Sequence, residues 1–203
     1  SDEDFEISYA GGAIGACHLH RGTVSAMAWR PTESDEFHIL LPQRGGLSYR
    51  ARKETIEVEG GRSLLLLPPP SRGRVDVEPR MSGISLITTI ENITSQAERI
   101  SGRTIKSSEI ATNVRNISLS DPLTSALARN MSSVFHEMLN LGSAGLSALA
   151  RTNFDELLLN MMTGVIVEDV RTAVGSGKSV TVSGSVVRQA QDYIRAHASE
   201  PIR

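Results

Sequence analysis

Cysteine is almost absent from this 203-residue sequence, because Cys17 is the only one. A single cysteine cannot form an intrachain disulfide, and it cannot supply the thiolate cluster of a zinc finger or an iron–sulfur site. A cytoplasmic location is therefore expected. Aromatic residues are also scarce, at 4% of the chain, whereas the length and the 39% of apolar residues are those of an ordinary globular protein with a buried core.

The sequence also lacks an excess of charge of one sign and a long apolar run. Twenty-one Lys and Arg against 23 Asp and Glu give a formal net charge of -2, too balanced to bind nucleic acid or an anionic membrane by charge alone. The longest apolar runs, 64–70 and 157–167, are shorter than the roughly 20 residues that a membrane-spanning helix needs. The acidic start, SDEDFE, does not resemble a secretory signal. Neither a membrane segment nor export is expected.

Short segments of strand type fill the chain from residue 8 to about residue 89. In Leu47–Arg52 apolar and polar residues alternate, as in a strand with one buried face. The apolar run Leu64–Leu67 ends at three prolines, which predicts a strand covered on both faces. Glycine pairs between such segments mark turns. The spacing predicts six to eight short antiparallel strands in a β-barrel or two-sheet roll.

Helical periodicity replaces the strand pattern in the second half of the chain. A short helix is expected at 92–100. Asp121 or Ser120 then caps a long helix that carries Pro122 in its first turn and ends at Gly142.

A second long helix is expected from about Leu146 to Val174, so that the two long helices form an antiparallel hairpin. A linker rich in Gly and Ser, 175–184, separates this hairpin from a last helix at 185–198. The predicted fold class is therefore α+β, with a β-roll followed by a helical hairpin and a final helix.

The first long helix carries an apolar stripe whose spacing of 4, 4, 3, 4 and 3 residues also fits a heptad seam. Such a stripe can pack onto the rest of the chain, or it can be shared by two subunits. We expect a homodimer with this stripe in its interface. Its residues are Leu123, Leu127, Met131, Val134, Met138 and Leu141.

Three motifs invite a chemical interpretation, and none of them supports an enzyme. The GSGKS segment, 175–179, lacks the earlier glycine, at Thr172, and the preceding strand of a phosphate-binding loop. His18 and His20 share a strand face, but no Glu and third His follow as in the metal-binding cupin pattern. Cys17 points away from His18 and is expected to be a buried, unreactive thiol. We predict no catalytic residue, no metal and no cofactor.

The aromatic residues suggest where a ligand binds. Only eight occur, and five of them precede Arg50. Aromatic side chains with a polar end suit a pocket that buries an apolar ligand and fixes its orientation. We predict that an effector binds inside the roll, against Met27, Trp29, Phe37 and Tyr49, although each of these side chains can also be ordinary core.

The last helix supplies a resemblance to a known family. Residues 185–203, SVVRQAQDYIRAHASEPIR, resemble the opening helix of an AraC/XylS-type DNA-binding domain. The upstream segments VEGGRSLLLLPPPSRGRVDVE and ISLITTIENITSQAERISG are similar to the cupin-like sensor barrel of that family and to the helix after it. The matching residues are Arg188, Ala190, Asp192, Tyr193, Ile194, Ala196, His197, Glu200, Pro201 and Ile202.

The resemblance implies a bacterial transcription regulator of AraC/XylS type, of which this chain is the effector-sensing and dimerisation part. The expected parts are a sensor roll at 1–118, a dimerisation hairpin at 119–174, the linker at 175–184 and the start of a helix-turn-helix domain at 185–203. The recognition helices are missing, so this chain itself should not read DNA. Binding to DNA, and to RNA polymerase if the protein is an activator, is implied for the rest of the molecule. The alternative is a small cupin-type metal-binding enzyme.

Overall fold

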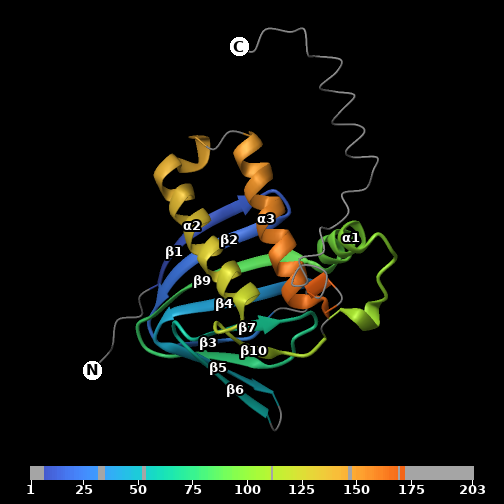
Figure 1. The fold of residues 1–203 in the computed structure, drawn as a ribbon. Coiled ribbons are helices and arrows are strands. Elements are labelled where there is room, and N and C mark those ends of the chain that lie inside the picture. The colour runs from blue at the N-terminus through green and yellow to red at the C-terminus, as the bar shows by residue number, and fades with distance from the viewer. Residues whose placement is uncertain are drawn as a thin grey trace, which may run out of the picture.

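The computed structural model describes residues 7–31, 35–51, 54–110, 112–145, 148–168 and 170–171, which form ten strands and three α-helices (Figure 1). Helix α1 is Ile90–Ser101, α2 is Pro122–Gly145 and α3 is Ala148–Ile166, and a 3₁₀ turn, η1, covers Ser107–Glu109. The predicted linker with its GSGKS segment and the predicted last helix, which carries the family resemblance, lie outside the described residues.

The strands form two antiparallel sheets, which fits the predicted two-sheet roll, but there are ten of them rather than the predicted six to eight. The larger sheet has the order β1 (Ile7–Ile14), β2 (Cys17–Val24), β9 (Met81–Thr89), β4 (Glu36–Arg44), β7 (Ser63–Leu67) and β10 (Arg115–Ser118). The smaller sheet has the order β3 (Met27–Trp29), β8 (Arg74–Val77), β5 (Gly46–Ala51) and β6 (Glu54–Glu59).

The helices cover one face of the larger sheet and the smaller sheet covers part of the other face (Figure 1). Strand β7 shows this arrangement best, because all five of its residues are buried. Leu64 and Leu66 belong to the core under the helices, whereas Leu65 and Leu67 belong to the core between the sheets. The prediction of a strand covered on both faces is confirmed.

Capping residues mark where α1 begins and ends and where α2 begins. The Thr89 hydroxyl accepts a hydrogen bond from the Asn92 amide (3.3 Å) at the start of α1, and Gly102 ends that helix in the left-handed conformation, with φ +69°. A carboxylate oxygen of Asp121 accepts from the Thr124 amide (2.9 Å) at the start of α2. Of the two caps predicted for α2, Asp121 is therefore the one that acts.

The predicted end of the first long helix is too early. Helix α2 continues through Gly142 to Gly145, because one glycine lowers helix stability by only about 1 kcal/mol and does not by itself end a helix. Helix α3 is Ala148–Ile166, and Glu168, Val170 and Arg171 after it are also helical. The first and last positions of the predicted span, 146–147 and 172–174, lie outside the described residues. The helical hairpin itself is confirmed.

Three residues of the predicted dimer seam on α2 lie inside the single chain, which corrects their assignment to a dimer interface. Leu127, Met131 and Val134 are fully buried in the core that α2 shares with α3 and the larger sheet, and Leu123 and Met138 are half-buried against it. Leu127, Met131 and Val134 therefore have no free surface to offer a second subunit. The side chain of Leu141 lies outside the described part of the chain.

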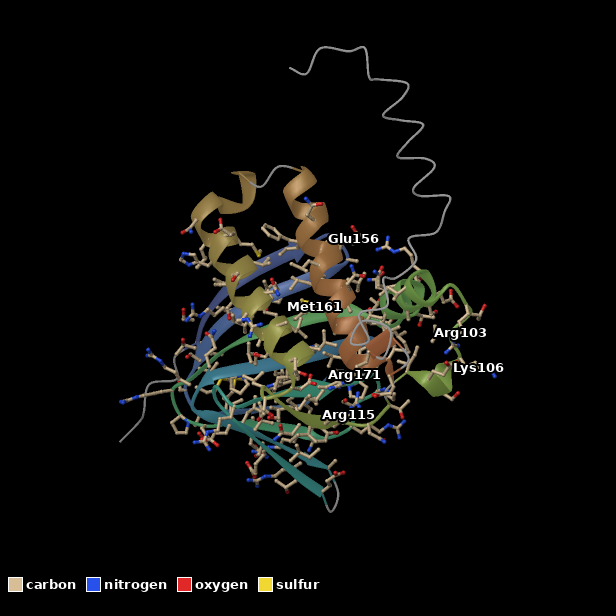
Figure 2. All side chains as sticks on the ribbon, viewed as in Figure 1. Arg103, Lys106, Arg115, Glu156, Met161 and Arg171 are labelled. Atoms are coloured by element: carbon tan, nitrogen blue, oxygen red, sulfur yellow. The ribbon has the colours of Figure 1, made fainter. Side chains whose placement is uncertain are left out.

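Polar contacts fasten the helices to one another. Arg171, after α3, pairs with Asp121 at the start of α2 (Figure 2). The Asn130 amide of α2 donates to the Met161 sulfur of α3 (3.4 Å). The Arg99 guanidinium of α1 donates to the Glu156 carboxylate of α3 (2.7 Å). Helix α3 is therefore tied to both of its neighbours.

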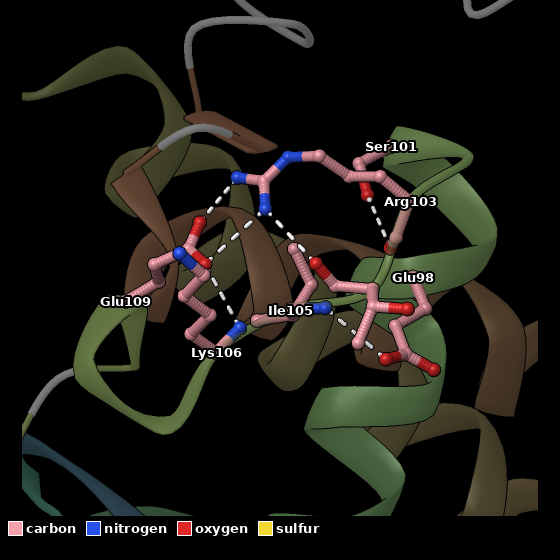
Figure 3. A network of polar contacts seen from close by, with 7 residues as sticks. Glu98, Ser101, Arg103, Ile105, Lys106 and Glu109 are labelled. Atoms are coloured by element: carbon pink, nitrogen blue, oxygen red, sulfur yellow. Dashed lines mark hydrogen bonds and ion pairs between the residues drawn. The ribbon is translucent and has the colours of Figure 1, made fainter.

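A network of main-chain and side-chain contacts shapes the loop after α1 (Figure 3). Arg103 pairs with Glu109, whose carboxylate also accepts from the Lys106 amide (2.8 Å). The Ile105 amide donates to Glu98 of α1 (3.1 Å). The Arg103 guanidinium, followed by the Lys106 amide, lowers the pKa of Glu109 to about 2. The loop is thus held in one shape where it turns back toward the sheet.

Candidate functional site

A cavity of about 310 Å³ lies between the two sheets of the roll. Both sheets contribute to its wall, which is almost entirely apolar. Its volume is near the lower end of the range for small-molecule sites, about 300 to 1,000 Å³. The apolar lining residues include Ile7, Val24, Met27, Leu40, Leu47, Val75, Val77 and Met81.

The few polar groups in this wall come from Tyr9, Trp29 and Ser85. Among the described residues, no charged side chain lines the cavity. Burial raises the pKa of the Tyr9 hydroxyl, so this group stays protonated at neutral pH and keeps its hydrogen. The site can therefore bury a mostly apolar molecule and form a small number of uncharged hydrogen bonds with it.

Strand register explains why these side chains meet. Tyr9 of β1 lies opposite Gly22 of β2, which lies opposite Gly83 of β9. Side chains at both glycines would crowd their neighbours, since a Cβ at Gly83 would lie 2.6 Å from the Leu41 carbonyl oxygen. The two glycines leave the inner face of the larger sheet open at this row. The cavity occupies the space next to it.

Of the four predicted ligand contacts, the structure places Met27 and Trp29 in the cavity wall. Phe37 is fully buried in the other core, under the helices, together with Ile39 and Leu41. Strand β4 is covered on both faces, so it is His38 and Leu40 that face the smaller sheet. Phe37 consequently cannot contact a ligand in this cavity, and its assignment is corrected.

Tyr49 lies in the core between the sheets but does not line the cavity. Its ring is held against the backbone of Gly73, where an added Cβ would come within 2.2 Å of the ring. Leu47, two residues earlier on the same face of β5, takes the position expected of Tyr49. The tyrosine is therefore a packing residue in this structure.

Several lining residues were not predicted. Val75 and Val77 alternate with Arg74 and Asp76 in β8, so the sequence places them on an inner face but does not say what they face. Tyr9 gave no signal, because the small residues around it hide the alternation of β1. Its position in the wall follows from pairing with β2, which is a tertiary property.

The histidines of the larger sheet lie beside the cavity rather than in its wall. The His38 ring is 6.4 Å from the Trp29 ring between centroids, and its Nε2 is 3.7 Å from the Glu36 carboxylate. Burial lowers the pKa of His38 in spite of that carboxylate, so His38 is neutral at pH 7.

His18 and His20 share one strand face, as predicted, with 6.1 Å between ring centroids. His20 stacks on Tyr9 (4.9 Å), and burial, followed by the nearby His18, lowers its pKa. Within the described part of the chain, no group of three or more His, Cys, Asp or Glu side chains is placed to hold a metal ion.

Cys17 is fully buried under the helices, while His18 is exposed on the other face of β2. Burial, with a smaller effect of the Asp155 carboxylate, raises the pKa of the thiol to about 12. The two side chains cannot act as a nucleophile and its base. The predicted buried thiol is confirmed.

A second hollow, of about 480 Å³, lies between the end of β4 and α2. It is more open than the cavity between the sheets, and half of its lining residues are polar, among them Gln43, Ser125 and Arg129. Gln43 donates to the Ser132 hydroxyl across it (3.2 Å). The apolar cavity between the sheets is less open and more apolar, so it is the better candidate for a ligand site.

No family model matches the sequence, and no curated protein matches it significantly. Solved structures do resemble the fold. The AraC-like transcriptional activator CuxR superimposes with a TM-score of 0.60 at 15% identity, over 80% of this chain and 56% of that chain. The present chain thus spans little more than half the length of that regulator.

Cupin proteins match a smaller part of the chain. A cupin superfamily protein from Desulfitobacterium hafniense DCB-2 has a TM-score of 0.37 at 13% identity, over 44% of this chain and 82% of that chain. A Cupin 2 conserved barrel domain protein from Salinispora arenicola CNS-205 has a TM-score of 0.36 at 13% identity, over 44% and 80%.

The likeness to the AraC-like activator includes helices as well as strands, because it covers 80% of the chain. It confirms the predicted fold, a cupin-like antiparallel roll followed by helices in the α+β class. At 15% identity the likeness concerns the fold and not the ligand or the activity. In the described part of the chain, no helix is long and apolar enough to cross a membrane.

Proposed function

We propose that this chain is the effector-sensing and dimerisation part of a cytoplasmic transcription regulator of AraC/XylS type. The observation that carries the proposal is the apolar cavity between the two sheets of the roll, in a chain whose fold resembles an AraC-like activator. The motif at residues 185–203 supports it, because it resembles the start of the DNA-binding domain of that family. Contact with DNA, and with RNA polymerase in an activator, would then belong to the domain that this motif opens.

The cavity favours a small apolar effector with one or two uncharged polar groups. A charged effector group would lose its hydration in a wall that, over the described residues, offers it no opposite charge. The Ser85 hydroxyl and the Trp29 indole N–H suit a single carbonyl, hydroxyl or ether group. Aromatic and branched aliphatic compounds of the size of the cavity fit this description.

The structure supports a route by which a ligand influences the helices. Tyr9 and Ile7, at one end of the β1–β2 hairpin, line the cavity. At the other end, the Ala16 amide donates to the Asp155 carboxylate of α3 (2.9 Å) and the Ala16 carbonyl accepts from Thr88 (2.8 Å). A ligand that favours one position of this hairpin therefore favours one position of α3, which leads toward the linker.

Binding in the cavity is tested with N-phenyl-1-naphthylamine, a neutral aromatic dye that fluoresces in apolar surroundings. We expect saturable binding to the 203-residue chain, with quenching of Trp29, the sole tryptophan. Val24→Phe fills part of the cavity from β2 and should weaken binding at least about tenfold, or 1.4 kcal/mol. Thr23→Phe is the matched control, because Thr23 is exposed on the opposite face of the same strand.

Equal dye affinity in the two folded variants would place the site elsewhere. Absence of saturable binding to the wild-type chain would mean that the cavity is a packing defect and does not bind ligand. Loss of binding in Val24→Phe alone, with an unchanged melting temperature, would support the proposed site.

The regulatory role is tested by joining residues 1–203 to the DNA-binding half of an AraC-type regulator. If the chain dimerises, it holds two DNA-binding units together, and the second unit then binds at a raised effective concentration. A gel shift on DNA with two half-sites should show at least about tenfold tighter binding by the fusion than by the isolated DNA-binding half. Equal binding by the two proteins would contradict the dimerisation role.

The second candidate function, a cupin-type metal-dependent enzyme, is favoured by the pair His18 and His20 on one strand face. Elemental analysis of protein purified without chelators separates the two functions. Two histidines without a third ligand make a weak site that would lose its metal during purification. About one zinc, iron or manganese per chain would therefore favour the enzyme.

A further inference from the structure

Strand β1 is a sheet edge that lacks the usual protection against pairing with another strand. It is eight residues long, has no charged residue and no proline, and lies at the outside of the larger sheet (Figure 1). Exposed edges of this kind are templates for strand addition, and proteins usually block them with charge, proline, bulges or short length.

The other three sheet edges in the described part of the chain are blocked in these ways. Strand β10 has only four residues and carries Arg115, and β3 has only three residues. Strand β6 carries three glutamates among its six residues, Glu54, Glu57 and Glu59. The open edge of β1 is therefore a local exception and not a general property of this fold.

The hydrogen-bonding groups along this edge point outward in a regular row. The two-residue turn at Gly15 and Ala16 makes Ile14 and Cys17 a hydrogen-bonded pair, and bonded and non-bonded pairs then alternate along the hairpin. Tyr9, Gly11 and Ala13 belong to the non-bonded pairs. Their amides and carbonyls consequently point away from β2, toward solvent in the single chain.

Exposed apolar side chains surround the same edge. The described residues include four large exposed apolar side chains, and two of them, Ile7 (48% exposed) and Tyr9 (64%), belong to β1. Met138 of α2 also lies beside β1, with its terminal methyl 3.8 Å from the position of a Cβ at Gly12. Helix α2 therefore places the half-buried Met138 side chain beside the open edge.

We propose that β1 pairs antiparallel with β1 of a second copy of this chain, so that the two larger sheets join across a two-fold axis. An edge that meets itself antiparallel is self-complementary, as a two-fold interface requires. The absence of charge along β1 means that this pairing sets no like charges opposite one another. The inference rests on the homodimer of the proposed function and assigns its interface to β1.

The first test is sedimentation equilibrium of the 203-residue chain and of two lysine variants. Ala10→Lys adds charge at an exposed position in the middle of β1, and it should weaken dimerisation at least tenfold. Thr55→Lys adds the same charge at an exposed position of the protected edge strand β6 and should leave dimerisation unchanged. Circular dichroism confirms that both variants are folded.

The second test is amide hydrogen exchange, which reports the row of outward-pointing groups directly. In the dimer, the amides of Tyr9, Gly11 and Ala13 should exchange as slowly as those of Ser8 and Ala10, which bond to β2. In folded Ala10→Lys they should exchange at least tenfold faster than in the wild type.

A wild-type chain that stays monomeric up to 100 μM would overturn the proposal. So would a dimer that Ala10→Lys leaves intact and whose three outward amides exchange freely, because its interface would then lie elsewhere. In that case the dimerisation role tested by the DNA fusion would survive, so the two failures are distinguishable. The proposal would also be contradicted if the chain were monomeric and β1 paired with a strand of another protein.

Discussion

Met131→Asp is expected to unfold this chain rather than to release a folded monomer. Met131 is fully buried where α2 meets α3 and the larger sheet. A carboxylate placed there without a partner costs several kcal/mol, and the lost methionine packing adds about 2 kcal/mol or more. The sum is comparable to the whole stability of a typical domain, about 5 to 15 kcal/mol. Thermal and urea unfolding followed by circular dichroism measure the effect.

Leu139→Asp is the matched control, because Leu139 lies on the same helix and is 56% exposed. It should leave the melting temperature within a few degrees of the wild type, as expected for a surface substitution. A Met131→Asp variant that folds, melts like the wild type and is monomeric would show that the stripe is a subunit interface. That result would contradict the core assigned to α2.

Cys17 is expected to react with a thiol reagent at least about a thousandfold more slowly in the folded chain than in the unfolded chain. The thiolate is the reactive form. With a pKa of about 12, roughly one Cys17 in ten thousand is a thiolate at pH 8, compared with roughly one in ten for a thiol whose pKa has the ordinary value of 9.0. Full burial adds to this protection, because the reagent must reach a side chain under the helices.

The measurement is the rate of release of thionitrobenzoate from Ellman's reagent at pH 8, with and without 6 M guanidinium chloride. Asp155→Asn is an informative variant, since it removes the charge that helps to raise the pKa of the thiol. It should speed the reaction of the folded chain, but burial should keep the rate far below that of the unfolded chain. Rapid modification of the wild-type chain without denaturant would show that Cys17 is accessible.

Elements with local signals could be predicted from the sequence alone. Asp121 and Pro122 mark the start of α2, because a cap and a proline act within one helical turn. The apolar run Leu64–Leu67 identified a strand with both faces covered. Periods of two and of 3.6 residues separated the roll from the helices, since each period follows from the geometry of its own backbone. These signals predicted the α+β class and the change from strands to helices, but not β10, which lies between α1 and α2.

What each buried face meets became clear only from the packing of the whole chain. Phe37 and His38 are neighbours in β4, which is covered on both sides, so alternation alone does not say which of them faces the smaller sheet. The stripe of α2 fits a subunit seam and a core equally well by spacing, and its burial against α3 and the sheet settles it.

The cavity and the open edge of β1 also depend on how the whole chain packs. Ile7 and Tyr9 line the cavity because β1 pairs with β2, and β1 is an edge because no other described strand pairs with its outer side. A period in the sequence records which residues share a face or an edge. It does not record what lies across from them, because that depends on contacts between segments far apart in the chain.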